Sequence, residues 1–107
     1  MRIDEYQTLA ARTINKELEP LEMLLHALHG LSAEVGELHG IYQKAYQGHD
    51  VDEDALKKEM GDILWMAAEF CTAKGWEMED ICRLNIDKLR KRYPQGFSEV
   101  RSIYREE

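Results

Sequence analysis

The chain contains few of the residues that interrupt or cross-link a fold. Only two prolines, Pro20 and Pro94, occur among its 107 residues, so long helices can run unbroken between them. The two cysteines, Cys71 and Cys82, do not form a Cys-x-x-Cys pair, which favours buried thiols over a disulfide or a zinc site. We therefore expect a fold that is held together by helix packing rather than by cross-links.

Long apolar runs and an excess of positive charge are also missing. No stretch approaches the roughly 18 consecutive apolar residues of a membrane span, and the first residues lack the apolar core of a signal peptide. The formal net charge of −7 disfavours anionic partners such as nucleic acid and membrane surfaces. We expect a cytoplasmic protein that binds neither nucleic acid nor membrane.

Apolar residues recur at helical spacing along most of the chain, whereas the alternation typical of strands is hard to find. The pattern predicts one all-α domain, residues 1–107, with a four-helix core bundle and a short C-terminal helix. The expected helices cover residues 4–16, 20–47, 52–74, 77–92 and 98–104. We expect Asp4 to cap the first helix, with Gln7 completing a capping box. The third helix has this expected inward stripe: Leu56, Met60, Ile63, Ala67, Phe70 and Cys71.

Two short acidic motifs stand out, E-V-G-E at residues 34–37 and E-M-G-D at residues 59–62. Residues three apart lie side by side on a helix. If the second and third helices pack antiparallel, four acids converge on one place: Glu34, Glu37, Glu59 and Asp62. Gly36 and Gly61 lie inside the motifs, and a helical glycine costs about 1 kcal/mol relative to alanine. We interpret both glycines as points where a neighbouring helix or a ligand approaches closely.

Converging carboxylates repel one another, so such a cluster is stable only when it is protonated or holds a cation. Ligation by oxygen atoms alone suits Mg²⁺, which proteins commonly share with substrate phosphates. The motifs therefore predict a Mg²⁺ site. Acid pairs at this spacing are also common on solvated helices, and that alternative stays open. His26 and His29 lack further zinc ligands, and Trp65 beside Asp62 fits a core position better than a base-stacking one.

Basic residues crowd the expected fourth helix of an otherwise acidic chain: Arg83, Lys88, Arg90, Lys91 and Arg92. Asn85 lies in the apolar row of that helix, so we expect it to face inward, and Lys88 follows it by three residues on one face. A cluster of acids that faces a cationic helix suits the binding of a metal-bound polyphosphate, with the metal on one side of the phosphates and Lys or Arg on the other. The basic run also complements the helix dipole, and Asn85 also fits a satisfied core amide, so both alternatives stay open.

The two acidic motifs, the opening I-D-E-Y-Q and the block N-I-D-K-L-R-K-R-Y-P-Q-G-F together resemble the MazG-like nucleoside triphosphate pyrophosphohydrolases, part of the all-α NTP pyrophosphatase superfamily. The resemblance implies hydrolysis of an NTP or dNTP to a nucleoside monophosphate and pyrophosphate. It implies that the catalytic, Mg²⁺-binding residues, with Mn²⁺ as a substitute metal, are Glu34, Glu37, Glu59 and Asp62. It implies that the substrate contacts include Asn85, Lys88, Lys44, Arg92 and Tyr93. It also implies a homodimer or homotetramer whose site lies between helices of paired subunits.

Related dCTP-preferring enzymes carry an aromatic residue four positions after the last metal acid, where this chain has Met66. Their base preference is therefore not carried over. The alternative function is a non-catalytic helical domain that keeps the fold and regulates or binds a partner. A di-iron carboxylate bundle is disfavoured, because it needs Glu-x-x-His motifs and none occurs.

Overall fold

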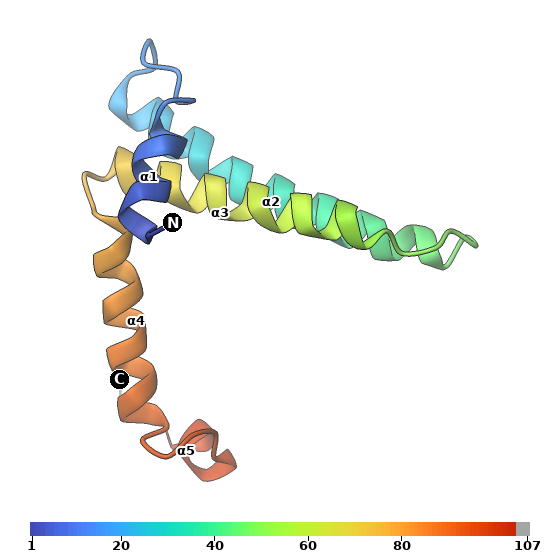
Figure 1. Ribbon diagram of the computed structural model, residues 1–107, viewed down its shortest axis with the longest axis vertical. Coiled ribbons are helices and arrows are strands. Elements are labelled where there is room, and N and C mark those ends of the chain that lie inside the picture. The colour runs from blue at the N-terminus through green and yellow to red at the C-terminus, as the bar shows by residue number, and fades with distance from the viewer. Residues whose placement is uncertain (105–107) are drawn as a thin grey trace.

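The structure is a computed structural model that describes residues 1–104 (Figure 1). Its helices are α1 (Ile3–Ala11), α2 (Pro20–Ala45), α3 (Glu53–Ala73), α4 (Met78–Arg92) and α5 (Glu99–Ile103). The all-α class is confirmed, and no strand occurs within residues 1–104. None of the helices in this part of the chain is both long and apolar enough to cross a lipid bilayer.

The two longest helices, α2 and α3, lie side by side as an antiparallel hairpin (Figure 1). Pro20 occupies the first turn of α2, where its missing N–H group is not needed. The Glu22 carboxylate accepts a hydrogen bond of 3.0 Å from the backbone just before that helix. Asp52 caps α3 by accepting hydrogen bonds of 3.0 and 3.2 Å from N–H groups of the first turn. These local signals place the acidic motifs on two facing helices.

The first helix is shorter than the sequence pattern predicts, because α1 ends at Ala11. The Thr13 hydroxyl donates a hydrogen bond of 2.7 Å to the carbonyl of Ala10. The Asn15 side chain accepts a hydrogen bond of 3.1 Å from a backbone N–H two residues further on. Such local side-chain bonds compete with helical hydrogen bonds. They explain why residues 12–19 form turns instead of continuing the helix.

The predicted capping box of the first helix is wrong. Asp4 lies inside the first turn of α1 rather than at its cap. Gln7 instead reaches the turn between α3 and α4. Its Nε2 donates to the Trp76 carbonyl at 2.8 Å and to Thr72 Oγ1 at 3.2 Å, and its Oε1 accepts from the Met78 N–H at 2.7 Å.

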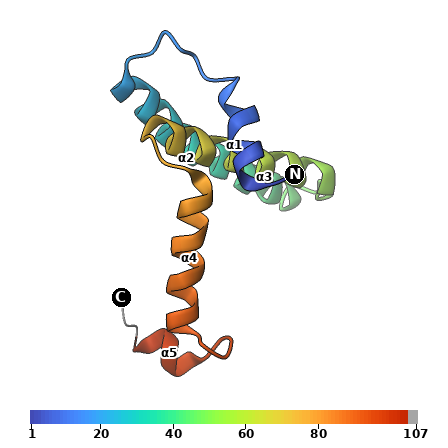
Figure 2. The ribbon, with the colours of Figure 1, turned by 60° about the vertical axis from the view of Figure 1, so that its left-hand side comes forward.

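The fourth helix forms an arm that leaves the hairpin at a steep angle, with α5 at its far end (Figures 1 and 2). The turn is built on Gly75, whose φ of 72° suits glycine. The Gly75 N–H donates to the Thr72 carbonyl at 3.0 Å, and the Trp76 N–H donates to the Cys71 carbonyl at 2.8 Å. These two bonds close the end of α3 and fix where the chain turns.

The inward stripe predicted for the third helix is partly wrong. Met60 is 48% exposed, whereas the buried residues of α3 are Met66, Ala68, Glu69 and Cys71. Glu69 is only 4% exposed, and its carboxylate lies 2.9 Å from Nδ1 of His26 on α2. A buried carboxylate needs such a partner. A pattern of apolar residues alone could not show that this helix buries an acid.

We expect His26→Leu to destabilise the protein by about 2–3 kcal/mol, because it leaves the Glu69 carboxylate buried without a hydrogen bond. Urea unfolding measures the change. The double variant His26→Leu, Glu69→Met should recover most of the loss, since it removes both partners. If His26→Leu is as stable as the wild type, the pairing of His26 with Glu69 contributes nothing to stability.

Candidate metal centre

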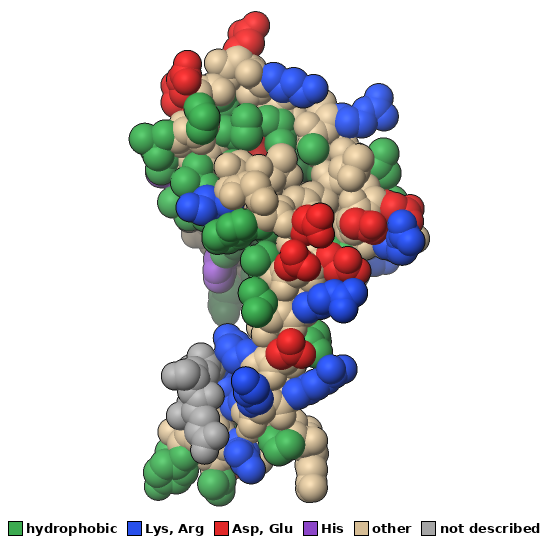
Figure 3. Space-filling model, turned by 90° about the vertical axis from the view of Figure 1, so that its left-hand side faces the viewer, with side chains coloured by type: hydrophobic (Ala, Val, Ile, Leu, Met, Phe, Trp, Pro, Cys, Tyr) green, Lys and Arg blue, Asp and Glu red, His purple; other side chains and the backbone are tan. Residues whose placement is uncertain are grey.

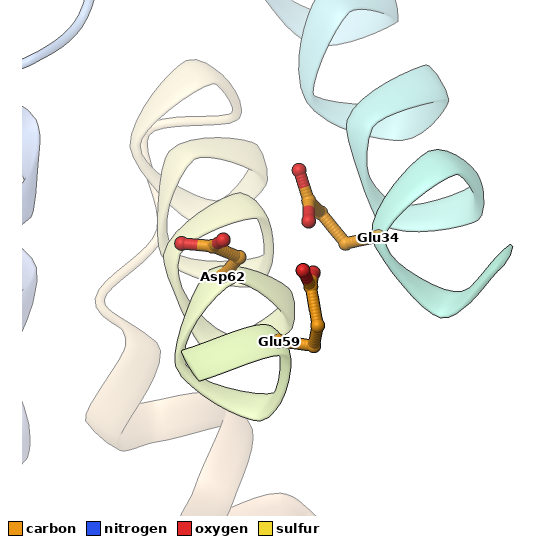
Figure 4. A group of neighbouring side chains, drawn as sticks. All are labelled: Glu34, Glu59 and Asp62. Atoms are coloured by element: carbon orange, nitrogen blue, oxygen red, sulfur yellow. The ribbon is translucent and has the colours of Figure 1, made fainter. Parts of the chain in front are cut away.

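Acidic side chains from α2 and α3 meet in the space between the two helices (Figure 4). Glu34, Glu59 and Asp62 each offer a carboxylate oxygen, and these oxygens lie within 4.8 Å of one another. Glu34 and Glu59 point toward each other across the hairpin, and Asp62 lies three residues further along α3. All three side chains are half-buried. The structure therefore gathers three of the four acids that the sequence singles out.

The cluster carries unbalanced negative charge. Oε2 of Glu34 and Oε2 of Glu59 are buried and accept no hydrogen bond from the described residues. Hydrogen bonding to Glu34, followed by burial, raises the pKa of Glu59. Hydrogen bonding to Glu59 and its charge raise the pKa of Glu37, which lies exposed at the edge of the cluster. A cation bound here would coordinate the unpartnered oxygens and would lower the raised pKa values of the carboxyl groups.

The raised pKa of Glu59 predicts how pH affects stability. A carboxyl with a raised pKa favours the protonated form in the folded state, so its stabilisation is present at low pH and is lost as pH rises through that pKa. Without metal, the melting temperature of Glu59→Gln should therefore increasingly exceed that of the wild type between about pH 4 and pH 7. Thermal melts in EDTA measure the difference, with Glu17→Gln in the exposed α1–α2 connection as the control. A difference that is independent of pH would contradict the prediction.

The glycines inside the acidic motifs do not mark a close approach of helices. A Cβ atom built on Gly36 or Gly61 would meet nothing within 4 Å, so that interpretation is wrong for a neighbouring helix. The close contact is at Gly30, where a Cβ atom would overlap the side chain of Met66. Gly30 lies one turn before Glu34 and Met66 one turn after Asp62. This contact lets α2 and α3 approach each other beside the acids.

Two aromatic side chains lie near the cluster, Tyr6 on α1 and Trp65 on α3. Burial, and then the charge of Asp62, raise the pKa of Tyr6, so its hydroxyl stays protonated beside the acids. Trp65 is fixed by a hydrogen bond of 2.7 Å from its Nε1 to Thr13 Oγ1. Tyr6 is not among the site residues expected from the sequence, although it lies in the opening I-D-E-Y-Q that contributes to the family resemblance.

The comparison with known families agrees with this geometry. The profile of the MazG nucleotide pyrophosphohydrolase domain matches residues 22–97, which include both acidic motifs and the whole of α4. The chain belongs to the MazG family. The Gene 37 protein of Mycobacterium phage L5 is 26% identical to this MazG domain over 105 residues, which cover 90% of this chain and 92% of the phage protein. No solved structure matches the chain.

The proposed substrate residues of this MazG domain do not meet the acids within one chain. Asn85 and Lys88 are exposed on α4, so the inward position expected for Asn85 is wrong for the single chain. Arg92 ends α4, and its guanidinium lies 6.0 Å from the ring centre of Tyr93. Lys44 is exposed near the end of α2, at the opposite end of the hairpin from the arm (Figure 1).

Proposed function

We propose that this MazG domain is a Mg²⁺-dependent nucleoside triphosphate pyrophosphohydrolase, which converts an NTP or dNTP into a nucleoside monophosphate and pyrophosphate. The observation that carries the proposal is the meeting of Glu34, Glu59 and Asp62 with two buried oxygens left unpartnered among the described residues. The donor set consists of oxygen atoms only, which fits Mg²⁺ and, as a substitute, Mn²⁺.

The proposed reaction uses the acids of the cluster in two ways. Glu34, Glu59 and Asp62 would hold the metal between α2 and α3. When bound, Mg²⁺ supplies positive charge that polarises phosphate oxygens and lowers the pKa of a water molecule. Glu37 lies exposed at the edge of the cluster, where it would either join the metal ligands or accept the proton of the attacking water. The protonated Tyr6 hydroxyl is available as a hydrogen-bond donor near Asp62.

The open shape of the chain supports a homodimer or a dimer of dimers. The radius of gyration is 17.0 Å, against about 13 Å for a compact domain of this length. The accessible surface is 8453 Å², against about 6,200 Å² for a folded monomer of this mass. The excess is about 2,300 Å² per chain, or about 4,500 Å² for two chains, which lies in the range of about 2,000–5,000 Å² that obligate homodimer interfaces bury in total. We infer that a second copy of the chain covers it.

The arm formed by α4 is the surface that best suits contact with a second copy of the chain. Apolar side chains are exposed along α4, including Leu84 and Ile86. Lys and Arg side chains gather around the same arm (Figure 3). A basic arm complements the acidic hairpin of another copy. We propose that the partner's α4 brings Asn85 and Lys88 to the phosphates, with Arg92, Tyr93 and Lys44 as further substrate contacts.

The test is pyrophosphate release from a panel of NTPs and dNTPs, with and without Mg²⁺, combined with the mass of the protein in solution. We expect Mg²⁺-dependent release from at least one nucleotide by a dimer or tetramer. A folded assembly that binds Mg²⁺ but hydrolyses no nucleotide would reject the enzyme in favour of the alternative, a non-catalytic domain that regulates or binds a partner.

A further inference from the structure

The fourth helix begins without a cap of its own. Its N-cap residue, Glu77, makes no side-chain hydrogen bond to the first turn. The first N–H groups of a helix have no partner within the helix and need one elsewhere. Here the Met78 N–H donates to Oε1 of Gln7 at 2.7 Å. The cap of α4 is therefore supplied by a residue of α1.

The same amide also holds the end of α3. Nε2 of Gln7 donates to the Trp76 carbonyl at 2.8 Å and to the hydroxyl of Thr72 at 3.2 Å. The amide of glutamine presents an NH₂ donor and a carbonyl acceptor side by side, so one side chain makes all three bonds. Gln7 is half-buried, and its bonds to Thr72 and Met78 are partly shielded from water. One side chain thus joins α1, the last turn of α3 and the first residue of α4.

The direction of α4 depends on few other contacts. The helix packs chiefly against α1 and α3, and most of its side chains are exposed. Asn85 and Lys88 lie about 10 and 15 Å along the helix from Met78. A tilt of about 10° at the turn would therefore displace them by about 2 Å. A displacement of this size is enough to break a hydrogen bond to a phosphate oxygen, so it would weaken nucleotide binding.

We propose that Gln7 is a positioning residue for the nucleotide. It sets the angle of α4, and through α4 the place of Asn85 and Lys88 against the polyphosphate, and it takes no part in metal binding. This inference rests on the proposed function for the identity of the ligand. The hydrogen bonds that carry it are independent of that function.

The test compares Gln7→Met, which removes the donor and the acceptor at similar volume, with Gln7→Glu, which keeps the acceptor for the Met78 N–H. We expect Gln7→Met to raise the KM for the nucleotide on the order of tenfold, as loss of a helix cap permits, with kcat changed by less than about twofold. The KM of Gln7→Glu should fall between those of Gln7→Met and the wild type. Thr8→Val, also on α1, is the matched control and should leave KM unchanged.

Two further measurements separate positioning from a general loss of structure. Hydrogen exchange should speed up in the first turn of α4 in Gln7→Met and stay unchanged in the α2–α3 hairpin. The rise in melting temperature on adding Mg²⁺ should match the wild type. An unchanged KM despite faster exchange, or a lost response to Mg²⁺, would overturn the proposal. If the wild type hydrolyses no nucleotide, the proposed function has failed, and unchanged exchange in α4 would then overturn the role of Gln7 as well.

Discussion

Glu59→Gln should lower the rate of Mg²⁺-dependent nucleotide hydrolysis by about three orders of magnitude, the upper range for loss of one preorganised electrostatic group. Glu59 lies between the other acids, since Glu34 raises its pKa and Glu59 in turn raises the pKa of Glu37. The amide keeps the size of the side chain but loses the charge that we propose to bind the metal. Steady-state release of pyrophosphate at saturating Mg²⁺ measures the effect.

Glu59→Gln should lower activity but raise stability in the absence of metal. Unfolding is then excluded as the cause of the lost activity. Without metal, Glu59→Gln should melt at a higher temperature than the wild type near neutral pH, because a repelling carboxylate is gone. It should also lose the stabilisation by Mg²⁺. Glu53→Gln, on the same helix but outside the cluster, is the control and should keep its activity. Wild-type turnover by Glu59→Gln would place the metal elsewhere.

Leu84→Glu should convert the assembly to monomers at micromolar concentration and abolish nucleotide hydrolysis. Leu84 is 65% exposed in the single chain, on the face of α4 assigned to the partner subunit. Burying a leucine contributes about 1.5–3 kcal/mol, and burying an unpaired charge there costs more. In a two-fold symmetric dimer each substitution acts twice. Light scattering after gel filtration measures the mass.

The matched control for this variant is Tyr46→Glu, because Tyr46 is 93% exposed and lies just after α2, at the end of the hairpin away from the arm. It introduces the same charge on an apolar residue that is not assigned to the interface. We expect the mass of Tyr46→Glu to equal that of the wild type. If both variants keep the wild-type mass, α4 is not the interface.

The sequence predicts the helices and the meeting of the acids because both depend on local spacing. Pro20 and Asp52 mark the starts of the two long helices, and Ser98 caps α5 as expected. Once α2 and α3 form a hairpin, the spacing within each motif brings the acids together. Their roles as metal ligands stay predictions, as do the roles of the substrate residues on α4.

The features that the sequence did not predict are contacts between polar groups far apart in the chain. Gln7 suggested a local capping box, yet its partners lie at the start of α4. The sequence gives no sign that Glu69 is buried, because its partner His26 lies 43 residues earlier in the chain. Gly30, rather than the glycines of the motifs, accommodates the neighbouring helix, and only the register of α2 against α3 decides this. The spacing of apolar residues along a helix does not predict contacts between polar groups that lie far apart in the chain.

If α4 packs on a second copy of the chain, as we propose, nucleotide hydrolysis depends on the abundance of the protein. If the acids belong to one copy and the cations to the next, each complete centre needs two chains. Below the dissociation constant of the pair, the number of centres rises with the square of the protein concentration. Twofold dilution would then remove about three quarters of the hydrolysis rather than half. A cell could therefore suppress the reaction steeply by a modest reduction in synthesis of the chain.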